Sequence, residues 1–131
     1  MHVVSAFVPC DPHALWLAFI DVTRLPAWVP GLRRAQTIAM SQGLPGEVHF
    51  ELGTHAYTLV YSYDTAERVV RWEPKLGARE GVSGFARFDV APGGTQLTYG
   101  LEQGAARNED ERRFGDTQAM VDAFVAWVTR R

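Results

Sequence analysis

Apolar positions along the chain follow two periods, one typical of strands and one typical of helices. Asp11 followed by Pro12 is typical of a helix start, and the Pro92, Gly93 and Gly94 triplet predicts a tight turn. In chain order the predicted elements are a strand over 2–8, a helix over 12–20, a brief helix over 23–28, strands over 33–40, 47–52, 56–63, 68–73, 82–90 and 95–102, and a final helix.

Apolar and polar residues alternate within these strands, so one face of each strand is predicted to turn toward the core. In 47–52 the alternation is strict. The residues predicted to face inward are Val48, Phe50, Leu52, Tyr57, Leu59, Tyr61, Tyr63, Val70, Trp72, Val82, Gly84, Ala86, Phe88, Val90, Leu97, Tyr99 and Leu101. Because Gly84 and Ala86 are very small, we expect unfilled volume beneath them.

The final helix is predicted from its ends and from its apolar face. Asn108 is a suitable N-cap, and Glu111, three residues later, completes a capping-box arrangement. The apolar residues at helical spacing are Phe114, Val121, Phe124, Val125 and Val128. We therefore expect a long C-terminal helix whose apolar face lies against the sheet.

Composition agrees with one ordinary globular domain spanning residues 1–131. Hydrophobic residues make up 47% of the chain and charged residues 21%, with a net charge of −2. Neither sign of charge forms a long block, so no nucleic acid is expected as a partner. The single Cys10 excludes an internal disulfide and favours a reducing compartment, with the cytoplasm as the expected location. The late apolar stretch 119–128 is too short for a transmembrane segment.

Four segments resemble the SRPBCC or START-like superfamily, and most of all its polyketide cyclase/dehydrase-like group. They are VPCDPHALW at 8–16, LPAWVP at 25–30, VRWE at 70–73 and PGGTQLTY at 92–99. The order of the predicted elements is similar as well. The resemblance implies an α+β helix-grip fold, in which a curved antiparallel sheet of about seven strands wraps around a long C-terminal helix. Members of this superfamily include lipid carriers, quinone-binding proteins and aromatic cyclases.

The predicted inner surface is aromatic and almost free of ionisable groups, which is typical of a pocket for a small apolar molecule. With the resemblance, this predicts that the protein binds a small hydrophobic ligand, such as a lipid, a polyketide or another aromatic or isoprenoid-like molecule. The predicted ligand-binding residues are Trp28, Phe50, Tyr61, Trp72, Gly84, Ala86, Phe88, Tyr99, Val121 and Phe124.

Two other functions stay open at this point. A cyclase or dehydratase would use Tyr61 and Tyr99 to polarise a carbonyl group, with Arg71 or Arg33 assisting if either side chain faces inward; no catalytic residue is assigned. A protein-partner adaptor would use the outer face of the sheet, and a homodimer is possible as well. The charged residues predicted on that face are Glu47, Glu51, Arg71, Glu73, Arg87 and Asp89.

Two possible reactive sites are rejected on sequence grounds. Glu47, His49, Glu51 and nearby His55 have metal-ligand chemistry, but their strand face is predicted to be the solvent face. Cys10 precedes a helix start, but the adjacent Asp11 opposes formation of a thiolate. We therefore predict no metal, no cofactor and no cysteine nucleophile.

Overall fold

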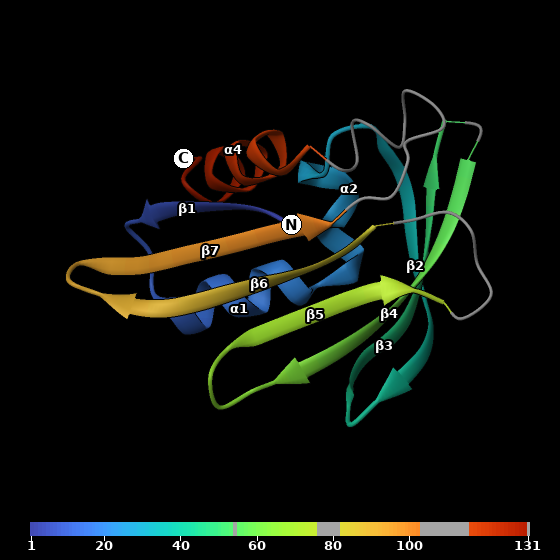
Figure 1. The fold of residues 1–131 in the computed structure, drawn as a ribbon, viewed down its shortest axis with the longest axis horizontal. Helices are drawn as coiled ribbons and strands as arrows, with labels where there is room; N and C mark the ends of the chain where they lie inside the picture. Colours follow the sequence, from blue (N-terminus) through green and yellow to red (C-terminus); the bar gives the residue numbers. More distant parts are fainter. Residues whose placement is uncertain (54, 76–81, 103–115, 131) are drawn as a thin grey trace.

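A computed structural model describes residues 1–53, 55–75, 82–102 and 116–130 (Figure 1). The elements, in chain order, are β1 (His2–Val8), α1 (Pro12–Ile20), the 3-10 turn η1 (Val22–Arg24), α2 (Leu25–Trp28), β2 (Leu32–Ser41), β3 (Leu44–Leu52), β4 (His55–Asp64), β5 (Val69–Pro74), β6 (Ser83–Ala91), β7 (Gly94–Glu102) and α4 (Thr117–Val128).

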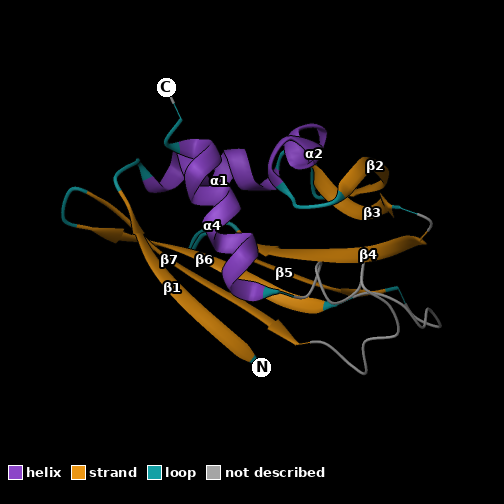
Figure 2. Ribbon diagram, turned by 90° about the horizontal axis from the view of Figure 1, so that it is seen from above, coloured by secondary structure: helices purple, strands orange, loops and turns teal. Residues whose placement is uncertain are grey.

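The strands form a seven-stranded sheet in the order β1-β7-β6-β5-β4-β3-β2. Every neighbouring pair is antiparallel. The first strand, β1, lies at one edge of the sheet and pairs with the last strand, β7. The other connections join consecutive strands, as the predicted turns require. Figure 2 shows α1, α2 and α4 on the same side of this curved sheet. The predicted helix-grip arrangement is therefore confirmed.

Aspartate caps fix where α1 and α4 begin. The Asp11 carboxylate accepts a hydrogen bond from the backbone N–H of Ala14 at 3.0 Å, as predicted for the start of α1. Asp116 caps α4 in the same way, accepting from the N–H of Ala119 at 3.1 Å. The predicted cap at Asn108, its partner Glu111 and the apolar Phe114 lie outside the described residues.

The brief helix predicted over 23–28 is present but is divided into two parts. Residues Val22–Arg24 form a 3-10 turn, which Asp21 caps by accepting from the backbone N–H of Thr23 at 3.1 Å. A single α-helical turn, Leu25–Trp28, follows, with Pro26 in its first turn. Proline lacks a backbone N–H and fits there without losing a hydrogen bond.

Strand alternation places the core on the helix side of the sheet. The cross-strand pairs Val48↔Leu59 and Phe50↔Tyr57 put four predicted inward residues on one face, and all four are buried. The same holds for Phe88↔Leu97 in β6 and β7. The register of the sheet thus follows the hydrophobic pattern, because a shift by one residue would expose each of these side chains.

Val90 was predicted to face the core, and this is wrong: its side chain is 73% exposed. It pairs with Thr95, which is fully buried because the chain at Cys10 lies over it. The β6–β7 hairpin extends beyond α1 (Figure 1), so no helix covers the β6 side of its tip. Alternation predicts a side chain's face but not how far the covering layer extends.

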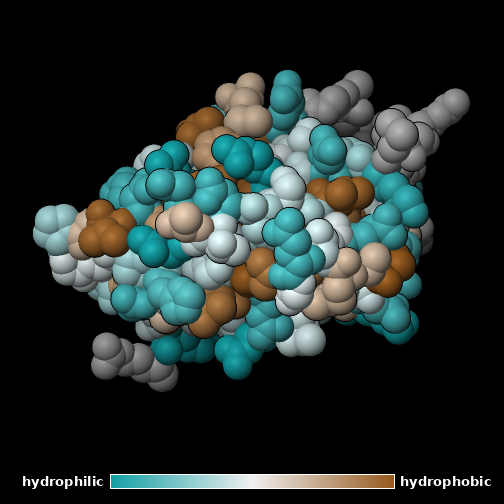
Figure 3. All heavy atoms as spheres, turned by 90° about the horizontal axis from the view of Figure 1, so that it is seen from below, coloured by the Kyte–Doolittle hydropathy of each residue, from teal (hydrophilic) through white to brown (hydrophobic). Residues whose placement is uncertain are grey.

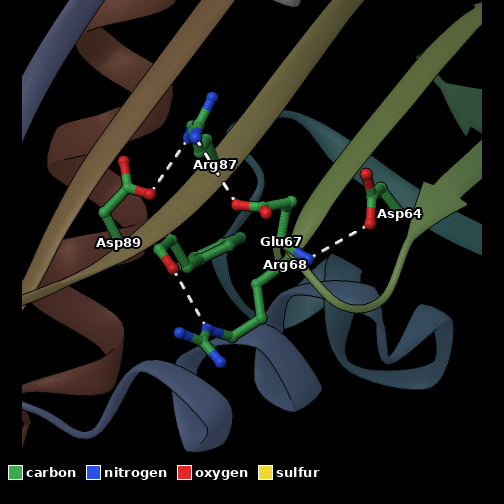
Figure 4. A network of polar contacts seen from close by, with 6 residues as sticks. Asp64, Glu67, Arg68, Arg87 and Asp89 are labelled. Carbon is green, nitrogen blue, oxygen red and sulfur yellow. Dashed lines mark hydrogen bonds and ion pairs between the residues drawn. The ribbon is translucent and has the colours of Figure 1, made fainter.

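The predicted start of β5 at Arg68 is one residue too early. Arg68 has a positive φ of 53° and belongs to the β4–β5 turn. Its guanidinium Nε donates to the carbonyl of Phe88 at 3.1 Å (Figure 4). The Phe88 N–H donates back to the Arg68 carbonyl at 3.1 Å. Beside it, Arg87 contacts Asp89 at 3.0 Å and Glu67 at 3.7 Å. These contacts hold the turn against β6.

Candidate functional site

A small cavity lies between the middle of the sheet and the helices that cover it. Its volume is about 30 Å³, which is close to the space that one water molecule takes up in the liquid. None of the described residues that form its wall is charged. The lining residues are Phe19, Leu25, Trp28, Val29, Phe50, Leu59, Tyr61, Trp72, Val82, Tyr99 and Met120.

Aromatic rings pack tightly around this cavity. Phe19, on α1, is the centre of the cluster. The distances from its ring centroid are 5.4 Å to Phe124, 5.5 Å to Phe88, 5.6 Å to Trp28, 5.9 Å to Trp72 and 6.0 Å to Tyr99. Several of these pairs meet edge to face, which is a favourable arrangement for aromatic rings. The cluster joins α1, α2 and α4 to the sheet and leaves little free volume in this conformation.

The structure brings together half of the predicted ligand-binding residues at the cavity wall. These are Trp28, Phe50, Tyr61, Trp72 and Tyr99. Phe88 and Phe124 belong to the surrounding aromatic cluster rather than to the wall. Ala86 and Val121 are buried in the same core but do not line the cavity.

Gly84 does not leave unfilled volume, contrary to the sequence-based expectation. A Cβ atom added there would collide with the carbonyl oxygen of Gly100 on the neighbouring strand. It would also come within 2.8 Å of Leu101 Cδ2 and 2.9 Å of Trp72 Cζ2. The space above this glycine is therefore filled by the large side chains of β5 and β7, and glycine is needed for their close approach.

Among the wall residues in and around α1 and α2, sequence reasoning named Trp28 but missed Phe19, Leu25 and Val29. It also missed Met120, on α4. Signals for two of these residues were present. Phe19 lies three residues after the buried Trp16, and Met120 lies four residues before Phe124, so each shares a helix face with a core residue.

Tyrosine hydroxyls are the main titratable groups near the cavity. Burial raises the pKa of Tyr99 above its ordinary value of 10.0. Burial also raises the pKa of Tyr61, and the nearby Tyr63 and Tyr99 add to that shift. Both phenols therefore stay protonated at neutral pH, where they can donate hydrogen bonds but cannot act as bases. Tyr63 donates to the carbonyl of Pro45 at 2.6 Å and is thereby used structurally.

Neither arginine named as an assisting group reaches the cavity. Arg71 is exposed on the outer face, between Val70 and Trp72, which are both buried. Arg33 is exposed as well, and its Nη1 donates to the carbonyl of Gly53 at 3.3 Å. Within the described residues, the cavity wall thus offers neutral hydrogen-bond donors but no cation and no general base.

The structure shows the surroundings of the Glu47 and His49 cluster and of Cys10, which the sequence had excluded as reactive sites. Glu47 forms an ion pair with Lys75 at 3.1 Å, and His49 Nδ1 shares a hydrogen bond with Thr58 Oγ1 at 3.2 Å. Across the ranges that the structure describes, no three histidine, cysteine, aspartate or glutamate side chains are grouped as metal ligands would be. Cys10 is a free thiol with partial burial.

The outer face of the sheet carries a mixed surface. A groove of about 300 Å³ runs over β4, β5 and β6, where Val60 and Phe85 lie beside Arg71 and Glu73. Exposed apolar side chains occur on the neighbouring edge, at Met1, Val3 and Phe7. Figure 3, a view along the helix and sheet layers, shows apolar side chains in separate small groups among polar ones.

Known structures share this arrangement of strands and helices. A START superfamily protein from Mycobacterium smegmatis matches with a TM-score of 0.75 at 13% identity, over 97% of this chain and 95% of that one. The Zhui aromatase/cyclase from Streptomyces sp. R1128 matches with a TM-score of 0.74 at 18% identity, over 99% and 93%. The chain has the START-like helix-grip fold. At these identities the likeness establishes the fold alone.

A third protein with the START-like fold is the STAR-related lipid transfer protein from Xanthomonas axonopodis. It matches with a TM-score of 0.72 at 12% identity, over 98% of this chain and 85% of that one. No protein-family model and no curated protein matches the sequence. Among the described helices, none has the length and apolar character needed to cross a bilayer.

Proposed function

We propose that this protein binds a small hydrophobic ligand between the sheet and the C-terminal helix. The observation that carries the proposal is the uncharged, largely aromatic cavity at the centre of the sheet–helix interface. Such a wall favours an apolar molecule, because no charge has to be removed from water when the molecule enters. The names of similar structures, a lipid transfer protein and an aromatase/cyclase, agree with apolar ligands on this fold.

Binding of a molecule larger than water requires the cavity to widen. We propose that widening occurs beside α2, the shortest α-helix in the described part of the chain. This element is one turn long, and its end is fixed by a hydrogen bond from the Val29 N–H to the Leu25 carbonyl at 2.9 Å. Trp28, Leu25 and Val29 all line the cavity. A small outward shift of this turn would therefore enlarge the space without breaking the sheet.

Catalysis is the alternative function, and the polar groups in the cavity wall limit which reactions are possible. A cyclisation or dehydration of a polyketide-like ligand would rely on Tyr61 and Tyr99 as donors to a carbonyl group. Because the pKa of both phenols is raised and the described wall holds no base, we rank binding above catalysis. A binding protein needs only the donors and the apolar surface.

A protein-partner adaptor is the second alternative, and a homodimer would use the same surface. It is favoured by the exposed apolar side chain of Met1, which lines the outer groove together with Val60 and Phe85. Light scattering during gel filtration gives the mass in solution and distinguishes a monomer from a dimer.

We propose that the protein is located in the cytoplasm, since its single cysteine is unpaired.

Native mass spectrometry of the protein purified from its own source tests the binding proposal. We expect a small-molecule adduct that disappears on denaturation. Val82→Phe adds a ring to the cavity wall and should abolish the adduct, whereas Val60→Phe makes the same change on the outer face and should retain it. Retention of the adduct in Val82→Phe, or its absence from the natural protein, would contradict the proposal. Chemical conversion of the bound small molecule into a product would favour an enzyme. A co-purifying protein would favour an adaptor.

A further inference from the structure

The indole N–H of Trp28 is a buried donor without a hydrogen-bond partner in the described part of the chain. The residue is only 6% exposed, so water does not satisfy this group from the surface. Buried polar groups in folded proteins are almost always paired, and the N–H of a buried tryptophan usually finds an acceptor. An unpaired donor at this depth therefore calls for an explanation beyond packing.

The position of Trp28 connects this donor with the cavity. Its ring is held between two phenyl rings, with centroid distances of 5.0 Å to Phe124 and 5.6 Å to Phe19. The residue belongs to the cavity wall together with Tyr61 and Tyr99. The packed rings hold the indole at the cavity wall, and its unpaired N–H is therefore available to a molecule that enters there.

The chemistry of the wall limits what could accept this hydrogen bond. An indole N–H only donates, and the raised pKa of Tyr99 keeps that phenol neutral, so that its hydroxyl can donate or accept a hydrogen bond. The lining residues include no arginine, lysine or histidine. An anionic group would have to lose its water without gaining a cation, which is strongly unfavourable. A neutral acceptor loses far less when it is buried.

We propose that Trp28 Nε1 donates a hydrogen bond to a neutral carbonyl oxygen of the bound ligand and thereby determines ligand specificity. This inference rests on the proposed binding function and adds to it the polar group that the ligand carries. It makes apolar ketones and quinones better ligands than hydrocarbons of the same shape. It also disfavours fatty-acid carboxylates.

Two probes of nearly identical shape test this role, fluorenone, which has a ketone group, and fluorene, which lacks it. We expect the natural protein to bind fluorenone about tenfold more tightly, in line with one buried hydrogen bond. Trp28→Phe should reduce this ratio to about one by weakening fluorenone binding alone. The matched control, Trp16→Phe, removes an indole that packs on Phe88 in the same core but does not line the cavity, and it should keep the preference.

A spectroscopic measurement on the natural protein keeps the test independent of variant stability. In proton–nitrogen correlation spectra the indole resonance of Trp28 is the one missing from Trp28→Phe. It should move downfield with fluorenone and stay in place with fluorene. Equal affinity for both probes, or a preference that survives Trp28→Phe, would overturn the role of Trp28 while leaving ligand binding intact. Failure to bind either probe would refute the binding function and this inference with it.

Discussion

Side-chain size is matched across strands at the inner face of β6. Gly84 lies opposite Trp72 on β5 and Leu101 on β7, and Ala86 lies opposite Tyr99. A small residue here is accompanied by large neighbours, so the strands together fill the layer. This is how close packing is usually reached in protein interiors. Small residues on an inward strand face are therefore not evidence of a cavity unless their neighbours are known.

This packing predicts that Gly84→Ala destabilises the fold by about 1 to 3 kcal/mol, because the added methyl group collides with the backbone of β7. Chemical denaturation followed by circular dichroism measures the change. Ser83→Ala, one residue away on the other face of β6, serves as the control and should change stability by less than about 0.5 kcal/mol. If both variants unfold at the same midpoint, the space above Gly84 is open after all.

At the scale of elements, a single buried hydroxyl ties the first part of the chain to the last strand. Thr95, at the start of β7, is fully buried and donates to the carbonyl of Cys10 at 2.7 Å. Cys10 lies in the link between β1 and α1. The bond thus fixes the point at which the chain leaves the sheet and turns into α1, which carries Phe19 into the aromatic cluster.

Thr95→Val should destabilise the protein by about 1 kcal/mol or more, because valine keeps the shape but leaves the Cys10 carbonyl without this donor. Thr98→Val removes a hydroxyl from the outer face of the same strand and is expected to have little effect. Thermal unfolding of both variants provides the comparison. An equal melting temperature for Thr95→Val and the natural protein would show that the link is held by packing alone.

At the scale of the whole molecule, folding removes the tyrosines from water and joins them to one aromatic interior. Tyr99 is 6% exposed, and Tyr61 and Tyr63 are partly buried against the same core. Burial raises the pKa of each of these phenols. The folded state therefore holds phenolic protons more tightly than the unfolded chain does, and stability depends on pH in the alkaline range.

The direction of this pH dependence follows from comparing the tyrosine pKa in the folded and unfolded states. Unfolded tyrosines ionise near pH 10.0, whereas Tyr99 in the fold stays protonated to a higher pH. Its contribution is fully present below pH 10.0 and is lost as the pH rises toward the folded pKa. We expect the free energy of unfolding to be constant between neutral pH and that value and then to fall. Tyr99→Phe should show a weaker fall, and the same slope in both proteins would contradict this prediction.

Much of the fold could be predicted from the sequence because its signals are local. The Asp11 cap, the turn at Pro92 and the strand alternation depend on neighbouring residues, and the structure confirms each of them. Predictions failed where they depended on distant parts of the chain. Val90 is exposed because the helix layer ends before it, and Gly84 is crowded because of residues on two other strands.

The sequence by itself determined the order of the elements, the face of each strand that turns inward, and the aromatic, uncharged character of the interior. These properties follow from periodicity and composition, which do not require knowledge of contacts. Only the tertiary structure decided the size of the cavity, the part that α1 and α2 play in its wall, and the unpaired N–H of Trp28. The reason is physical: free volume and hydrogen-bond pairing arise from side chains that meet across elements, and packing, not local pattern, fixes those distances.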